Sequence, residues 1–442
     1  MSYRESIFNV FIRNDNKYLL FNTLTGQILQ LSDNKIIINE LSNFQIKLMS
    51  ESGFIVSGDF DHKKEFMDVI NKIQRTPDCL YVVFTITTKC DLTCKYCFEN
   101  RENRITMSPN TFKKSMEWIE SKLSTGLFSK LYIVIFGGEP LLEPLYIKNL
   151  IRSIKKLCKK NNIDLLPILL TTNALKGTKK LFLDLKKIGL NHLQISFDGS
   201  GYFTNKNRKI RDGKNDHNRN IYVETLKLIP FLSHNFLLTI KLNFSPENIL
   251  SIEEFFSDLI ALPDLNMESV IIKPETIMIT TDILKNKSTQ ISLYSPEDIE
   301  LANAFDLICR AANEKQFKID TSSFFITPCM AFSGSSFLIE PNGQIRNCIS
   351  AFGVDEFYIT DLSCEIKNDN CNSFSIGDIN FNECINRRCR FFPLCAGGCP
   401  YEKLLLKKKM DYILCRKEYF EKALPVYVKQ KWIDSKYHVY FQ

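Results

Sequence analysis

Residues 81–97 read YVVFTITTKCDLTCKYC, in which a run of apolar residues leads directly into a loop with Cys90, Cys94 and Cys97. The β-branched and aromatic residues of the first half predict a buried strand. A closed zinc site needs four ligands, so these three thiols alone do not complete one. Three thiolates do suit a four-iron, four-sulfur cluster that keeps one iron open for another ligand.

Strand-like and helical patterns alternate on both sides of this loop, from Leu80 to about Phe317. This alternation predicts a parallel sheet with crossover helices, partly closed as a (β/α)6 TIM-like barrel. Ligands of such sheets bind at the carboxyl ends of the strands, which is where the cysteine loop lies. The six expected strands cover residues 81–87, 131–136, 165–172, 192–197, 236–244 and 268–273.

Two further regions flank the expected barrel at 80–318. Residues 1–76 combine short strand-like runs with two helical patterns, which predicts a small α+β, winged-helix-like domain. Residues 319–442 are rich in cysteine and turns, which predicts a cysteine-rich extension. The α/β fold therefore divides into domains at 1–76, 80–318 and 319–442.

Composition narrows the functional classes. The net charge of +7 is spread over a Lys-rich chain, which is typical of a solvated surface and predicts no nucleic-acid partner. There is no secretory pattern, and the longest apolar runs have strand length, so we expect a cytoplasmic protein with no membrane partner. Stable disulfides are rare in that compartment, so most of the fifteen cysteines require another role. Isolated Cys158 and Cys309 are interpreted as core thiols.

A second motif, GGEP at Gly137–Pro140, follows the expected strand at 131–136. Two glycines allow the backbone to approach a ligand closely, and Glu139 offers a carboxylate to a cation. As a lone motif it also fits a tight turn. Its place after a strand, some forty residues beyond the cysteine loop, makes it more specific.

Together these motifs resemble the radical S-adenosylmethionine enzymes, whose C-x3-C-x-aromatic-C motif is matched by Cys90, Cys94, Tyr96 and Cys97. The resemblance implies that the open iron of a [4Fe–4S] cluster binds S-adenosylmethionine. Its reductive cleavage then yields a 5′-deoxyadenosyl radical that takes hydrogen from the substrate. The catalytic acid or base stays unassigned.

The same resemblance implies further contacts to the cofactor. The segments TTNA (171–174) and ISFDGSG (195–201) are similar to strand ends of the family, and NKNRKIRDG (205–213) is similar to its Arg-containing loop. A solvated basic loop remains the alternative for the last segment. The implied contacts are Tyr96, Gly137, Gly138, Glu139, Ser196, Asp198 and Arg208.

The C-terminal region resembles the SPASM extension, whose cysteines bind two auxiliary [4Fe–4S] clusters. The family pattern ends C-x2-C-x5-C-x3-C, whereas the first gap here has four residues, which puts Cys384 in doubt. A zinc ribbon is the alternative, and three clusters would bring roughly twelve iron atoms per chain. The matching cysteines are Cys329, Cys348, Cys384, Cys389, Cys395, Cys399 and Cys415.

The family's arrangement implies a division of these ligands. Cys384, Cys389, Cys395 and Cys415 would hold one cluster. The other would be held by Cys329, Cys348 and Cys399, and its fourth ligand stays open between Cys364, Cys371, Cys79 and none.

The resemblance favours maturases of ribosomally made peptides, with a cytosolic reductant. Residues 1–76 resemble the leader-binding region of such enzymes, which bind the precursor peptide by strand addition; a structural cap is the alternative. A sulfatase maturase is disfavoured, because Ile349 replaces the aspartate expected after Cys348. A thioether or carbon–carbon cross-link is the expected product. Epimerisation, or a non-catalytic iron–sulfur protein that binds peptides or transfers electrons, is the alternative.

Overall fold

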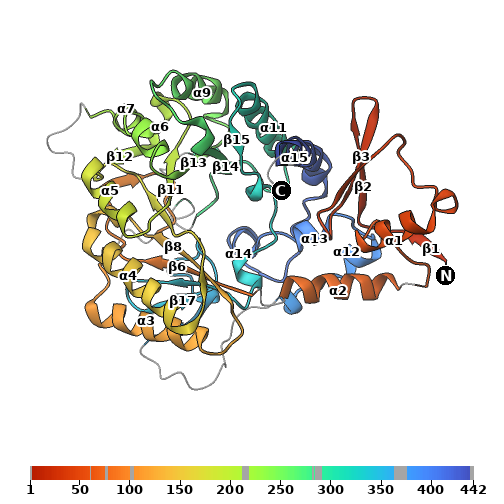
Figure 1. The fold of residues 1–442 in the computed structure, drawn as a ribbon, viewed down its shortest axis with the longest axis horizontal. Coiled ribbons are helices and arrows are strands. Elements are labelled where there is room, and N and C mark those ends of the chain that lie inside the picture. Colours follow the sequence, from red (N-terminus) through yellow and green to blue (C-terminus); the bar gives the residue numbers. More distant parts are fainter. Residues whose placement is uncertain are drawn as a thin grey trace.

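A computed structural model describes residues 2–59, 61–74, 78–99, 104–211, 219–280, 283, 291–362 and 376–438. Its largest element is a sheet whose parallel strands curve into a partial barrel with helices on the outer face (Figure 1). All six expected strands are present, so the predicted α/β partial barrel is confirmed. In spatial order the strands are β15 (Lys318–Ile319), β14 (Val270–Thr276), β13 (Leu237–Phe244), β11 (His192–Phe197), β10 (Leu169–Thr172), β8 (Lys130–Phe136), β6 (Cys79–Thr85), β16 (Ser336–Ile339), β17 (Gln344–Arg346) and β18 (Tyr358–Asp361).

One expected strand is shorter than the sequence pattern suggests. The run at 165–172 splits into β9 (Asp164–Leu165), which pairs with β8, and β10, which pairs with both β8 and β11. Pro167 lies between the two pieces. Because proline has no backbone N–H, it cannot donate to a neighbouring strand in the middle of a sheet.

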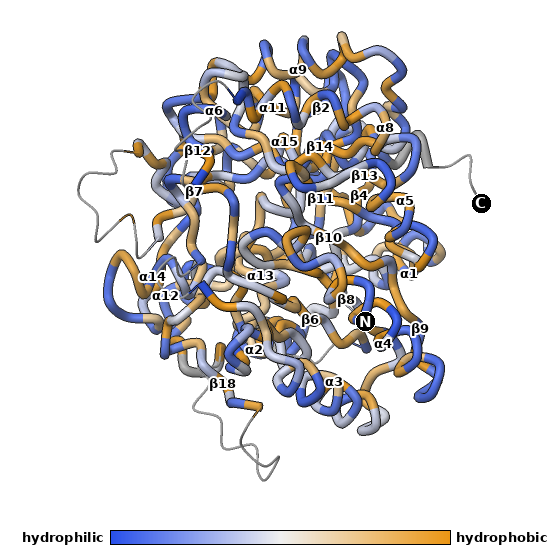
Figure 2. Tube along the Cα trace, turned by 90° about the vertical axis from the view of Figure 1, so that its left-hand side faces the viewer, coloured by the Kyte–Doolittle hydropathy of each residue, from blue (hydrophilic) through white to orange (hydrophobic). Residues whose placement is uncertain are grey.

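The two faces of the sheet have different surroundings. Leu80, Val82 and Phe84 of β6 are buried in the large core beneath the helices, whereas Val83 belongs to an apolar cluster on the inner side. Hydrophobic segments follow the strands, while helices such as α4 alternate between both kinds of residue (Figure 2). The barrel helices are α3 (Pro109–Leu123), α4 (Pro144–Asn161), α5 (Lys179–Lys187), α6 (Gly201–Asn207), α7 (Ile221–Leu226), α8 (Ile229–Ser233), α9 (Ile252–Ile260) and α11 (Ile299–Glu314).

The cysteine-rich region is built partly into the same sheet. Strand β16 pairs in parallel with β6, and β17 and β18 continue antiparallel from it. The sheet therefore extends beyond the expected barrel limit at residue 318. Short helices and one long helix complete the region: α12 (Asn382–Asn386), α13 (Phe392–Cys395), α14 (Pro400–Lys407) and α15 (Lys417–His438).

The N-terminal unit is a small α+β structure that lies beside α12, α13 and α15 (Figure 1). Phe66 and Phe392 pack with ring centroids 5.0 Å apart. Lys431 donates to the carbonyl oxygen of Gly26 at 2.8 Å. The unit thus rests on the cysteine-rich region. Its elements are β1 (Tyr3–Glu5), β2 (Asn9–Asn14), β3 (Lys17–Asn22), β4 (Ile28–Leu31), α1 (Asn43–Glu51), β5 (Ile55–Ser57) and α2 (His62–Gln74).

Candidate functional site

The three-cysteine loop is anchored to a distant segment of the chain. It follows β6, and part of it forms β7 (Leu92–Cys94), which pairs antiparallel with β12 (Arg208–Ile210). Cys94 lies opposite Arg208 in this pair. Arg211 donates to the carbonyl oxygen of Cys90 at 3.1 Å. These contacts fix the loop at the carboxyl end of the barrel, where the sequence placed it.

The GGEP segment lies directly against the residues that precede Cys90. The backbone N–H of Gly138 donates to the carbonyl oxygen of Thr87, and that of Glu139 donates to Lys89, both at 2.8 Å. A Cβ on Gly138 would lie 2.3 Å from the carbonyl oxygen of Lys89. The close approach of the two loops therefore requires glycine at this position.

The carboxylate of Glu139 is fully buried and bonded to the chain itself. Oε1 accepts hydrogen bonds from Thr172 at 2.6 Å and from the backbone of Leu141 at 2.9 Å, and Oε2 accepts one from the backbone of Asn173 at 2.7 Å. Burial raises the pKa of Glu139 to about 7, and these hydrogen bonds oppose the shift. Asn173 in turn donates to Asp91 at 2.8 Å. Glu139 thus joins the ends of β8 and β10 to the cysteine loop.

Tyr96, Asp198, Arg208 and Asn243 form a buried polar network beside the cysteines. Oδ1 of Asp198 accepts hydrogen bonds from Tyr96 at 2.5 Å, from Asn243 at 2.9 Å and from Arg208 at 3.2 Å. Arg208 also donates to the hydroxyl of Tyr96 at 2.9 Å. The second oxygen, Oδ2 of Asp198, is buried and has no hydrogen-bond partner among the described residues.

The network brings together Tyr96, Asp198 and Arg208, which the family resemblance implied as cofactor contacts. It also contains Asn243, which the sequence analysis did not identify. Asn243 is the penultimate residue of β13 and is 5% exposed. A polar residue near the end of the apolar run FLLTIKLNF (236–244) was the available signal. The network fixes Tyr96 next to Cys97, so it determines how the cysteine loop is presented.

The inner face of the barrel becomes polar away from β6. Ser196, Lys241 and Lys273 lie opposite one another on β11, β13 and β14. They alternate with residues buried under the helices, so they lie on the inner face. Burial lowers the pKa of Lys241, and Glu275 opposes this shift. The half-buried Ser196 therefore lies on this polar wall.

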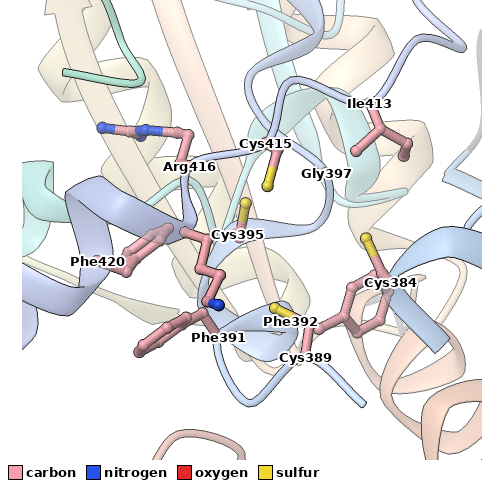
Figure 3. A pocket seen from close by; sticks show the side chains of 11 residues that line it. Cys384, Cys389, Phe391, Phe392, Cys395, Gly397, Ile413, Cys415, Arg416 and Phe420 are labelled. Carbon is pink, nitrogen blue, oxygen red and sulfur yellow. The ribbon is translucent and has the colours of Figure 1, made fainter. Parts of the chain in front are cut away.

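Four C-terminal cysteines surround one small cavity: Cys384, Cys389, Cys395 and Cys415. Figure 3 shows their sulfur atoms around a shared space, with Phe391, Phe392 and Phe420 among the side chains that enclose it. Burial raises the pKa of Cys384 to about 12, and the other three thiols add to the shift. The structure therefore brings Cys384 to the other three despite its atypical spacing.

A second thiol group contains Cys329, Cys348 and Cys399. All three border the apolar cluster around Ala331 and Tyr401. Burial raises the pKa of Cys399, and the thiols of Cys329 and Cys348 contribute to that increase.

The candidates for a fourth ligand of this group are distributed differently. Cys79 begins β6, and its electrostatic neighbours are Lys130 and Asp78. Cys364 and Cys371 lie outside the described residues. Within the described ranges all thirteen cysteines are free of disulfides, and no three Cys, His, Asp or Glu side chains form a site for a single metal ion.

A family model described as the radical SAM superfamily matches residues 84–233. These residues contain the cysteine loop, GGEP and the Asp198–Arg208 pair. Residues 84–233 therefore correspond to a radical SAM domain. Radical SAM domains use S-adenosylmethionine and one [4Fe–4S] cluster, so these cofactors follow from the match.

Proteins of known sequence match parts of this chain. An uncharacterised protein of Methanocaldococcus jannaschii, MJ0907, is 27% identical over 44% of this chain and 63% of its own length. The radical SAM cyclopropyl synthase TigE of Paramaledivibacter caminithermalis is 25% identical over 51% of this chain and 53% of its own. The chain thus spans less than two thirds of the length of these curated relatives.

Solved structures share the fold over most of the chain. Native anSMEcpe with bound AdoMet has a TM-score of 0.61 at 16% identity and covers 80% of this chain and all of its own. Streptococcus suis SuiB bound to S-adenosylmethionine has a TM-score of 0.54 at 16% identity and covers 92% and 98% of the two chains. The radical SAM domain therefore lies in an architecture that extends through the cysteine-rich region.

The residues present fit the cofactors of a radical SAM domain. The loop supplies three partly buried thiols that are free of disulfides. Thiolates are the preferred protein ligands of iron–sulfur clusters, and three of them leave one iron open. The unpaired Oδ2 of Asp198 provides a hydrogen-bond acceptor close to Tyr96.

No helix among the described residues is both long enough and apolar enough to span a membrane.

Proposed function

We propose that this chain is a radical SAM peptide maturase that installs a thioether or carbon–carbon cross-link in a ribosomally made precursor peptide. One observation carries the proposal: the same chain combines the barrel with an N-terminal α+β unit and with two groups of C-terminal cysteines. The structure of SuiB bound to precursor peptide SuiA supports the proposal of a peptide substrate. This structure covers 93% of this chain at a TM-score of 0.52.

The chain's own residues bind and orient in this proposal. Cys90, Cys94 and Cys97 would hold the cluster, and Gly137 and Gly138 would contact the cofactor. When bound there, the cluster and S-adenosylmethionine would supply the radical chemistry that removes hydrogen from the substrate.

The remaining proposed contacts surround this centre. Glu139 fixes the GGEP segment against the ends of β8 and β10. Tyr96, Asp198 and Arg208 hold the loop in place, and Ser196 lies on the inner wall towards the substrate.

The auxiliary cysteines are proposed to hold two further [4Fe–4S] clusters. Cys384, Cys389, Cys395 and Cys415 would hold the first, in the cavity that they line. Cys329, Cys348 and Cys399 would hold the second, with a fourth ligand among Cys79, Cys364, Cys371 and none. A cross-link removes two hydrogens, so a place for the second electron is needed, and auxiliary clusters provide one.

A sulfatase-type activity is less well supported. Ile349 lies with Val83 and Phe352 in the apolar cluster of the inner barrel face. A carboxylate that could accept a proton is therefore replaced by an aliphatic side chain at this position.

The product itself provides the test of the proposed function. We expect the peptide encoded by a small open reading frame beside the gene, co-expressed without oxygen, to lose two hydrogens. Mass spectrometry with fragmentation would locate the link. A peptide whose mass is unchanged in ordinary water but which gains deuterium in heavy water would instead indicate epimerisation. An unmodified peptide, despite active cleavage of S-adenosylmethionine, would contradict a peptide substrate of this kind.

The N-terminal unit is proposed to bind the leader of the precursor. Strand β4 ends the three-stranded sheet β2–β3–β4, while β2, at the other edge, packs against α15. An extended peptide can add to an open edge through backbone hydrogen bonds. Apolar side chains that follow β4 are exposed, and among them Phe44 is 75% and Leu48 50% accessible.

We expect the double change Phe44→Asp, Leu48→Asp to weaken peptide binding by about tenfold or more, since burial of a large apolar side chain contributes roughly 1.5–3 kcal/mol. Fluorescence anisotropy with the labelled precursor would measure it. Leu127→Asp is the matched control, because Leu127 is 67% exposed in the turn before β8. Equal affinities of both variants would rule out this docking face.

A further inference from the structure

Lys403 is a fully buried lysine whose ammonium has no hydrogen-bond partner in the part of the chain that the structure describes. It lies on α14, its exposed fraction is 0%, and its Nζ atom makes no hydrogen bond with any described residue. A buried, unpaired ammonium is costly, so proteins place such a charge beside a compensating negative one. The described protein atoms supply no direct partner for it.

Lys403 lies between segments that carry both auxiliary thiol groups, because its backbone N–H donates to the carbonyl oxygen of Cys399 at 3.0 Å and its ammonium lies close to the four-cysteine cavity. A Cβ on Gly397, which lines the four-cysteine cavity, would be 3.6 Å from Nζ of Lys403. Burial lowers the pKa of Lys403 to about 8, and four thiols oppose this shift. In order of strength these are Cys395, Cys399, Cys329 and Cys384, two from each group.

Other buried charges nearby are engaged differently. Arg416 donates to the carbonyl oxygen of Pro296 at 2.7 Å and stacks on Tyr419 at 4.1 Å. Arg416 also acts on Cys395 and on the buried Glu402. Lys403 therefore differs from Arg416 in having an unbonded ammonium that acts on thiols of both groups.

We propose that Lys403 is a shared counter-charge of the two auxiliary centres and holds the reduction potentials of both clusters above the values they would have without it. This inference rests on the proposed auxiliary clusters. Three or four thiolates give such a cluster a net negative charge, and a one-electron reduction adds one further negative charge. A fixed cation in a dry interior favours the reduced form, and net charge is among the factors that set these potentials.

A redox titration of the full-length, iron-loaded protein tests the proposal. We would compare Lys403→Met, which keeps the apolar stem, with Lys403→Arg, which keeps the charge. Lys407→Met is the matched control, because Lys407 lies one turn further on α14 and is exposed. Electron paramagnetic resonance would follow both auxiliary signals, and the signal lost on replacing Cys90, Cys94 and Cys97 would identify the third cluster.

We expect Lys403→Met to lower the reduced-to-oxidised ratio of both auxiliary clusters about tenfold at fixed potential, or about 59 mV for a one-electron couple. In Lys403→Arg and Lys407→Met, both auxiliary clusters should keep the potentials of the parent protein. The cluster of the radical SAM site should keep its potential in every variant. Loss of auxiliary iron in Lys403→Met but not in Lys403→Arg would also support a role of the charge.

Two results would overturn the inference. Unchanged auxiliary potentials at full iron content, or equal loss of iron in both Lys403 variants, would show that Lys403 only fills space. A parent protein that binds about four iron atoms rather than about twelve would instead refute the auxiliary clusters themselves. The iron content of the parent therefore separates failure of this inference from failure of the proposed function.

Discussion

Replacing Gly138 by alanine should reduce cleavage of S-adenosylmethionine by roughly 100-fold. The new Cβ would lie 2.3 Å from the carbonyl oxygen and 2.6 Å from the carbonyl carbon of Lys89. Carbon atoms in contact are normally ~3.5–4.0 Å apart, so the two loops must separate by about 1 Å. Cys90 follows Lys89 directly, and a displacement of that size at a reacting centre costs about two orders of magnitude.

The measurement is the formation of 5′-deoxyadenosine per iron-loaded chain after reduction with dithionite. Gly126→Ala is the control, because a Cβ on Gly126 would meet nothing within 4 Å. Because Gly126 has a positive φ of 75°, alanine there costs about 1 kcal/mol of local backbone strain. A Gly138→Ala protein that cleaves the cofactor at the parent rate would show that the two loops do not need this approach.

The second large effect concerns the buried pair of Arg208 and Asp198. Their side chains are 8% and 0% exposed. Arg208→Met leaves the carboxylate of Asp198 buried without its cation, which should destabilise the protein by about 3–5 kcal/mol. We also expect the cysteine loop to loosen, because Arg208 donates to Tyr96 and lies opposite Cys94.

Thermal unfolding of the single and double variants would test this expectation. The double variant Asp198→Asn, Arg208→Met should recover much of the lost stability, since it removes the uncompensated charge. Lys206→Met breaks the partly exposed pair with Glu247, which is worth at most about 1 kcal/mol. If Arg208→Met and Lys206→Met melted alike, the buried network would not stabilise the loop.

Local motifs made much of the fold predictable from the sequence. Six strands were recognised because their apolar runs are buried on both faces of a parallel sheet, as in β6 and β13. The start of α3 also follows from local sequence, since Ser108 accepts a hydrogen bond from the backbone of Thr111 and Pro109 follows it. The start of α1 is likewise set locally, because the capping box of Ser42 and Gln45 begins that helix at Asn43.

The candidate site was predictable only where its residues are close in the sequence. Cys90, Cys94 and Cys97 share one loop, so their spacing alone suggests a common ligand. Asn243 joins Asp198 from 45 positions away, and nothing in the spacing connects them. Strand β16 was missed as well, because its short run SFLI (336–339) becomes a strand by pairing with β6.

The sequence by itself indicated the chemistry proposed for the centre, because thiol spacing, glycine content and strand-to-loop order are local properties of the chain. Only the tertiary structure decided which distant groups meet. It brought Cys384 to the cavity of Cys389, and it buried Lys403 between two thiol groups. In the run PYEKLLLK (400–407) this lysine is indistinguishable from a solvated one. Burial arises from packing between segments, so it becomes visible only when the chain is folded.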